Sequence, residues 1–296
     1  MNKTRLTVKD SSLGFLVGFL LCQFAVVVAT SVGLIIYSML GFKSDTFMSF
    51  INAGVGYTII SLVLYLTMLC VFLFFNKKKE NKIFKPIKFT KILLYVGVAI
   101  CSFLCLYPII VCFDSLLVKC GATINSLPYD LTTKNYFLSL ISLVIAPAIC
   151  EELLFRGIIF QGLRKHGKTL AITISSIMFC LYHMAISQTL YPILIGLLLG
   201  VIMYHEENIY YCIVVHLTNN LTTLTLSYFN VNLAFNHWSY IILAIILAVA
   251  FIATILYFAI RNNQTSEKQP IEKRDKIYLI VSLVVMLILW IFTNFG

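Results

Sequence analysis

The sequence predicts an all-α fold, a polytopic transmembrane helical bundle of about eight or nine helices. Of its 296 residues, 60% are hydrophobic and only 11% are charged, whereas soluble domains carry about 25% charged residues. Apolar runs of about 20 residues, the length that crosses a bilayer as a helix, recur along the chain. The runs do not alternate polar and apolar residues, which excludes a membrane barrel.

Nine apolar runs predict the individual helices. No hydrophilic stretch between them is long enough for a soluble domain, so the bundle must itself carry the function. The first run is too long for the core of a signal peptide and lacks a clear cleavage site, so we expect an uncleaved anchor. The expected spans lie near residues 12–40, 51–75, 92–113, 137–162, 169–187, 190–204, 208–228, 238–260 and 277–295.

The net charge is +10, and the basic residues that produce it are concentrated in alternate loops. Seven lysines lie between Lys77 and Lys91, and further basic clusters precede the first span and follow the fourth and the eighth. Because such loops stay in the cytoplasm, we expect a multi-pass protein of the cell membrane with a cytoplasmic N-terminus. The basic loops then serve as topology signals that also contact membrane lipid, and a nucleic-acid partner is not expected.

The nine cysteines predict neither a disulfide framework nor a structural zinc site. Most of them lie within apolar spans, where cysteine acts as a small hydrophobe. No CxxC pair occurs.

A few polar side chains lie deep within the expected spans. Charges at the bilayer centre cost several kcal/mol, so a chain rarely keeps them without a use. Ten of the twelve acidic residues fall in loops or at the edges of spans, which leaves two glutamates inside. The intramembrane set is Glu151, Glu152, Arg156, His183, His216, Asn219 and Asn220.

Depth and helical spacing predict how this set is arranged. Counted from the cytoplasmic edge, the polar groups of three helices lie about 20 Å deep. Glu152 and Arg156 are four residues apart and can neutralise each other, while His216 and Asn220 share one face of another helix. Glu151, about 100° further round, is then left without a partner on its own helix.

An unpaired carboxylate that faces two histidines in a dry pocket suits a general base. A water between Glu151 and His183 can be deprotonated for attack on a carbonyl group. His216 and Asn220 can donate hydrogen bonds to the developing oxyanion. Phe179, one turn before His183, is expected to shape the pocket by packing. The set predicts a hydrolase that needs neither a serine nor a cysteine nucleophile.

A metal site is the competing interpretation. Two histidines and a glutamate can bind zinc, with Glu151, His183 and His216 as the ligands. The HExxH signature of many zinc peptidases is absent. We therefore expect no cofactor, with zinc as the alternative.

Three ordered motifs resemble those of the CPBP intramembrane proteases: Glu151-Glu152-x-x-x-Arg156, Phe179-x-x-x-His183 and His216-x-x-x-Asn220. This family includes type II CAAX prenyl proteases and bacteriocin-processing and self-immunity proteins. The resemblance implies that Glu151 and His183 activate water, that His216 and Asn220 stabilise the oxyanion, and that Glu152 and Arg156 support the site. It also implies a protease core at 137–230, between transmembrane helices at 1–136 and 231–296.

The resulting hypothesis is an intramembrane endopeptidase that cleaves small membrane-associated peptides or lipid-anchored C-termini. Two alternatives come from other classes. One is a non-proteolytic membrane scaffold or bacteriocin-immunity protein, because the resembled family includes members without demonstrated proteolysis. The other is a proton-coupled transporter that uses the carboxylates as a relay, although no internal repeat supports it.

Overall fold

A computed structural model describes residues 5–77, 82–122, 124, 131–231, 242, 245–246, 249–253 and 269–295. The described part contains helices and no strand, which confirms the all-α prediction. The α-helices are α1 (Val8–Met39), α2 (Ser44–Ile51), α3 (Gly54–Asn76), α4 (Phe89–Lys119), α5 (Thr133–Ser139), α6 (Ala146–Leu154), α7 (Phe160–Leu163), α8 (Lys168–Tyr182), α9 (Leu190–Glu206), α10 (Ile209–Tyr228) and α12 (Lys273–Phe295). Two π-helical segments, Leu140–Ile145 and Phe155–Ile159, join α5, α6 and α7, and short 3₁₀ turns occupy Arg164–His166 and Ile186–Gln188.

Six of the described helical stretches are long and apolar enough to cross a membrane. They include the run Thr133–His166, in which α5 to α7 follow one another, and they coincide with six of the nine expected spans. Two more expected spans coincide with α8, which has 15 residues, and with α10, which has 20. The span expected at 238–260 lies largely outside the described residues. The protein is thus a multi-pass helical membrane protein.

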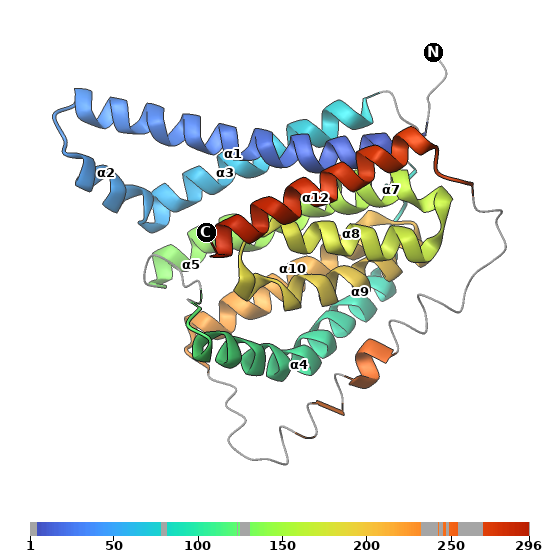
Figure 1. Cartoon of the computed structure of the whole chain (residues 1–296). Helices are drawn as coiled ribbons and strands as arrows, with labels where there is room; N and C mark the ends of the chain where they lie inside the picture. Colours follow the sequence, from blue (N-terminus) through green and yellow to red (C-terminus); the bar gives the residue numbers. More distant parts are fainter. Residues whose placement is uncertain are drawn as a thin grey trace.

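The helices form a bundle with one projecting arm (Figure 1). α8, α9 and α10 lie near the centre, α4 packs against α10 on one side, and α1, α3 and α12 cover the other side. The distal part of α1, together with α2 and the start of α3, extends beyond the bundle. α12 runs along both α1 and α8, so the C-terminal helix closes the bundle over its centre.

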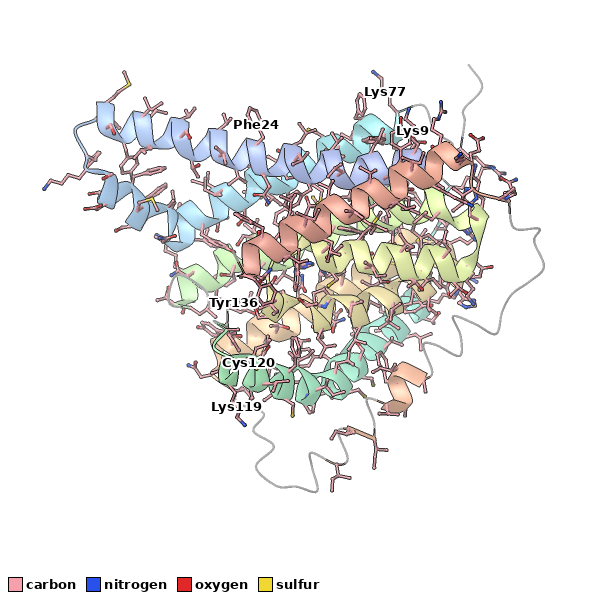
Figure 2. The ribbon with its side chains drawn as sticks, viewed as in Figure 1. Lys9, Phe24, Lys77, Lys119, Cys120 and Tyr136 are labelled. Atoms are coloured by element: carbon pink, nitrogen blue, oxygen red, sulfur yellow. The ribbon has the colours of Figure 1, made fainter. Side chains whose placement is uncertain are left out.

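The burial pattern is that of a protein surrounded by lipid. Outer helices expose large apolar side chains; Phe24, which points away from α1 in Figure 2, is 66% exposed. The stretch from Leu153 to Phe160 is by contrast almost entirely enclosed, and Arg156 lies within it at 0% exposure. The helix that carries the two predicted glutamates is therefore the centre of the fold.

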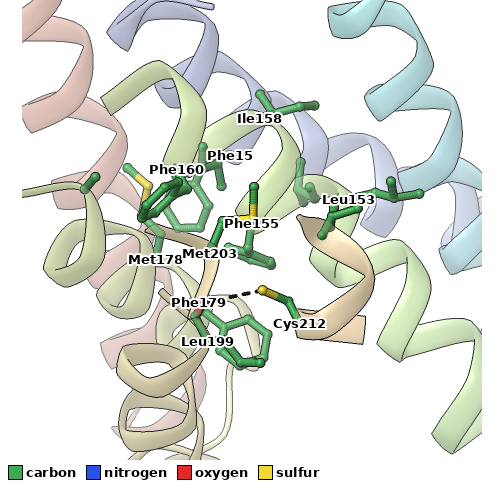
Figure 3. Packing of buried hydrophobic residues seen from close by; sticks show 14 of the residues in the cluster. Phe15, Leu153, Phe155, Ile158, Phe160, Met178, Phe179, Leu199, Met203 and Cys212 are labelled. Atoms are coloured by element: carbon green, nitrogen blue, oxygen red, sulfur yellow. Dashed lines mark hydrogen bonds between the residues drawn. The ribbon is translucent and has the colours of Figure 1, made fainter. Parts of the chain in front are cut away.

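The core around this stretch is built from aromatic and aliphatic side chains of several helices (Figure 3). Phe155 packs edge-on against Phe179 of α8, with ring centroids 5.0 Å apart. The thiol of Cys212 on α10 donates to the backbone carbonyl of Leu199 on α9 (3.5 Å), the dashed contact in Figure 3. These contacts fix α8, α9 and α10 around the central stretch.

Glycines allow two helix pairs to approach closely. A Cβ atom at Gly162 would lie 2.1 Å from Oγ of Ser11, so α1 packs directly on the backbone that follows the central stretch. On α9, Gly196 and Gly200 face α8, where a Cβ atom would come 3.1 Å from Ser176 and Ile172 respectively. Gly196 and Gly200 therefore form a close-packing face of α9.

One end of the bundle carries a charged network. Glu207, directly after α9, accepts a hydrogen bond from Lys85 (2.7 Å) and another from Arg164. Hydrogen bonds from Lys85 and Arg164 outweigh its partial burial, so the pKa of Glu207 is lowered from its ordinary value. This network ties the segment before α4 to the turns at the ends of α7 and α9.

Candidate functional site

The two glutamates lie on α6, between the two π-helical segments. A π-helical turn carries an additional residue compared with an α-helical turn, and such turns are frequent at functional sites. Both side chains are enclosed by the bundle: Glu151 is 8% exposed and Glu152 is 0% exposed. The backbone irregularity thus coincides with the most unusual polar residues of the chain.

The predicted contact between Glu152 and Arg156 is present. Nη1 of Arg156 donates to Oε1 of Glu152 (2.9 Å), and both side chains are completely buried. Nη2 of Arg156 donates to the carbonyl oxygen of Gly196 on α9 (3.1 Å). Because the buried guanidinium has both a carboxylate and a carbonyl partner, the pair also joins α9 to the central helix. Spacing alone did not reveal the Gly196 contact.

His216 lies between the two glutamates. Its Nδ1 is 2.9 Å from Oε1 of Glu152, and its Nε2 is 3.8 Å from Oε2 of Glu151. A carboxylate can only accept, so Nδ1 carries the proton and Nε2 faces Glu151. The sequence predicted that His216 and Glu151 lie at one depth, but not that Glu152 orients the imidazole ring. That role needs a contact between helices, which helical periodicity within one segment cannot show.

Phe179 packs against both histidines, as its predicted place beside the pocket requires. Its ring meets that of His183 edge-on at 4.9 Å and that of His216 at 5.8 Å. The guanidinium of Arg156 lies over the same ring, 4.9 Å from its centroid. A cation over an aromatic face is attracted to it. Phe179 therefore holds the charged pair and both imidazoles in one arrangement.

His183 caps the end of α8 and is partly exposed. Its Nδ1 lies 2.8 Å from the carbonyl oxygen of Phe179, to which it donates, so in the neutral ring Nε2 keeps a lone pair. Among the described residues, the ion-pair contacts of Glu151 within 4.0 Å include His216 but not His183. The structure therefore brings Glu151 and His216 together directly, whereas His183 lies beyond 4.0 Å from the Glu151 carboxylate and contacts the ring of Phe179.

The two asparagines of α10 differ in their surroundings. Asn219 is buried, accepts a hydrogen bond from the hydroxyl of Tyr191 (2.8 Å) and donates to the carbonyl of Val215 (3.0 Å). Asn220 is half-buried and makes no side-chain hydrogen bond within the described part of the chain. Asn219 therefore joins α9 to α10, while the amide of Asn220 keeps its hydrogen-bonding capacity.

The predicted zinc ligands do not form a metal centre in this arrangement. No group of three or more His, Cys, Asp or Glu among the described residues is placed to hold a metal ion. Glu151 and His216 do approach each other, and each histidine uses Nδ1 for a carbonyl or carboxylate contact, as the histidines of many zinc sites do with their second nitrogen. The donor chemistry of Glu151, His183 and His216 fits zinc, but their three positions do not fit one shared ion in this arrangement. The zinc alternative stays a prediction.

The fold and the site define a class: a multi-pass helical membrane protein with a buried glutamate–histidine–arginine cluster between its helices. Residues 133–222 match the family model described as Type II CAAX prenyl endopeptidase Rce1-like. The match spans α5 to α10 and contains every predicted site residue. It confirms the resemblance to the CPBP intramembrane proteases and supports a CAAX-type intramembrane protease in general. Searches of curated proteins and of solved structures gave no significant match.

Proposed function

We propose that the protein is an intramembrane endopeptidase that uses water activated by Glu151 and His183. Its substrates are membrane-associated peptides or lipid-anchored C-termini. The observation that carries the proposal is the position of His216, which contacts Glu152 at 2.9 Å and Glu151 at 3.8 Å inside the segment that matches the family.

In the first step a water molecule loses a proton and attacks the carbonyl carbon of the scissile peptide bond. Glu151 is the general base, because its carboxylate is enclosed and Arg156, further along the same helical run, is bonded to Glu152 instead. His183 accepts a hydrogen bond from the same water through Nε2, the nitrogen left free by the Phe179 contact. In this proposal the attacking water lies between Glu151 and His183.

The second step requires stabilisation of the oxyanion formed on the former carbonyl oxygen. The side-chain amide of Asn220 donates one hydrogen bond. His216 can donate a second from Nε2 only as an imidazolium, because Nδ1–H is already given to Glu152. Glu152 faces this positive ring on one side and Arg156 on the other, so the charges alternate across the cluster.

Collapse of the intermediate breaks the C–N bond and completes the reaction. The proton taken from water by Glu151 passes to the leaving nitrogen, which departs as an amine. The products are a carboxylic acid and an amine, the acid then gives up its proton to the amine or to water, and the base is regenerated. Because water is the nucleophile and neither a serine nor a cysteine attacks the substrate, no covalent intermediate with the protein forms.

The test uses purified protein in liposomes and an internally quenched farnesylated CAAX peptide, with the unprenylated peptide as a second substrate. Glu151→Gln, His183→Ala and His216→Ala are each expected to lower kcat at least 10²-fold. Glu272→Gln is the matched control, because Glu272 is an exposed carboxylate at the start of the described C-terminal segment. Full cleavage by all three site variants would overturn the mechanism, and no cleavage by the wild type would favour a scaffold or a transporter.

Metal dependence is tested on the same preparation. If Glu151 is the base and no metal takes part, dialysis against a chelator leaves kcat unchanged. If zinc is required, activity is lost on dialysis and returns with added zinc.

A further inference from the structure

We infer that Asn294, near the end of α12, is a positioning residue for His183, an inference that rests on the proposed function. Asn294 lies about 70 residues beyond the segment that matches the family. Its side-chain amide binds the turn that directly follows His183. The C-terminal helix would therefore take part in building the site.

The turn after His183 has an unusual need for hydrogen bonds. α8 has 15 residues and is about 22 Å long, which is shorter than the hydrocarbon core of about 30 Å. Non-helical backbone at that depth persists only where the protein satisfies its polar groups. Residues 184–189 therefore depend on neighbouring side chains for partners that water would supply at a surface.

Asn294 supplies two of these partners. Its Oδ1 accepts from the backbone N–H of Ile186 (2.7 Å), and its Nδ2 donates to the carbonyl oxygen of Met184 (3.3 Å). Nδ2 also donates to the carbonyl oxygen of Trp290, one turn earlier on α12 (2.7 Å). The last contact fixes the side-chain rotamer, so the amide is held ready for the turn. α12 runs beside α8 in the same direction, which brings the two ends together (Figure 1).

The conformation of Met184 gives these contacts a specific purpose. Met184 has φ = 53°, in the left-handed region that a residue with a side chain seldom adopts. The position after a helix cap is commonly glycine for this reason. Here a methionine adopts the conformation, and Asn294 binds its carbonyl group. Loss of Asn294 would allow Met184 to leave the left-handed region and move His183, its neighbour.

A shift of His183 affects the reaction more than substrate binding. Nε2 of His183 must lie within hydrogen-bond reach of the attacking water, and displacement of a reacting group by about 1 Å can cost 10²-fold in rate. Asn294→Ala is therefore expected to lower kcat about tenfold and to leave KM within about twofold.

The experiment combines kinetics with hydrogen exchange on liposome-embedded protein, with the quenched farnesylated CAAX peptide as the substrate. Asn294→Ala should raise amide exchange in the segment from His183 to Thr189 and lower kcat. Thr293→Val is the matched control on the same helix turn, since within the described residues its exposed hydroxyl bonds to Leu289 of α12 and to no other helix. Adding Met184→Gly to Asn294→Ala should restore part of kcat and reduce exchange, because glycine adopts the left-handed region without strain.

Several outcomes separate this inference from the proposed function. Unchanged exchange in Asn294→Ala, or raised exchange with wild-type kcat, would overturn the role of Asn294 while leaving the protease intact. A fall in kcat of equal size in Thr293→Val would show general damage to α12 and would also overturn it. If the wild type cleaves neither peptide, the proposed function fails and the catalytic role of Asn294 fails with it.

Discussion

Nδ1 of His216 donates to Oε1 of Glu152 across 2.9 Å, from α10 to the central helix. The same oxygen accepts a hydrogen bond from Arg156. One carboxylate thus neutralises a buried guanidinium and sets the orientation of a neighbouring imidazole. This double use means that stability and activity can be separated by mutation at the cluster.

Glu152→Ala should destabilise the protein strongly. Removing the carboxylate leaves the charge of Arg156 buried without its partner, and such changes cost about 3–5 kcal/mol. We expect a lower thermal midpoint in detergent, measured by the fluorescence of a thiol-independent dye or by light scattering.

The double variant Glu152→Leu/Arg156→Met provides the separation. Replacing both charges with apolar side chains of similar size is expected to recover most of the lost stability. Activity should stay absent, since His216 loses the partner of Nδ1. A stable and fully active double variant would contradict the orienting role of Glu152.

Asn220→Ala should lower kcat with little effect on stability. Asn220 is half-buried and makes no side-chain hydrogen bond within the described residues, so its removal leaves no partner unsatisfied. Loss of one oxyanion donor typically costs about 10²–10³-fold in kcat. Asn219→Ala is the comparison: it removes the Tyr191 contact and should lower the thermal midpoint more than Asn220→Ala does.

Gly162→Ala should weaken the packing of α1 against α7, the helix that contains Gly162. The added methyl group would lie 2.1 Å from Oγ of Ser11 and 2.3 Å from the backbone carbonyl oxygen of Thr7. Overpacking of this kind costs about 1–3 kcal/mol. Gly97→Ala on α4 is the control, because nothing within 4 Å opposes its new methyl group. Equal unfolding midpoints for the two variants would show that the close approach is not required.

The contribution of Glu207 to stability should depend on pH. Because its pKa is lowered in the folded protein by hydrogen bonds from Lys85 and Arg164, the ionised form is the stabilising one. The contribution is present above the unfolded pKa of about 4.3 and is lost as pH falls through the lower folded value. The difference in thermal midpoint between wild type and Glu207→Gln should therefore shrink as pH is lowered from 6 towards about 3. A constant difference over that interval would refute this role.

Much of the fold could be predicted because lipid imposes a simple rule on sequence. Each span must be long and apolar, so eight of the nine expected spans coincide with described helices. Within one helix, spacing of four residues was enough to predict the Glu152–Arg156 contact. The resemblance read from the three motifs is confirmed by the family match over residues 133–222, because three motifs in fixed order carry more information than any single one.

The contacts between helices could not be predicted in the same way. His216 donates a hydrogen bond to Glu152, and Arg156 donates one to the carbonyl of Gly196. Both contacts depend on the rotation and tilt of the helices, which hydrophobic periodicity does not determine. Asn294 lies more than 100 residues from the turn it binds, and nothing near it in the sequence indicates that partner. The predicted catalytic roles stay predictions that the experiments above address, and the cytoplasmic N-terminus stays a prediction.

The π-helical segments on either side of α6 carry a consequence for protein engineering. Each one rotates the backbone relative to a regular α-helix, so the direction of Glu151 and Glu152 is set by the winding of the segments Leu140–Ile145 and Phe155–Ile159 as well as by the glutamates themselves. Copying the Glu-Glu-x-x-x-Arg pattern onto an ideal α-helix would reproduce the residue sequence. The carboxylates would, however, point in a different direction around the helix axis. A transplanted site would need its irregular winding carried along with it.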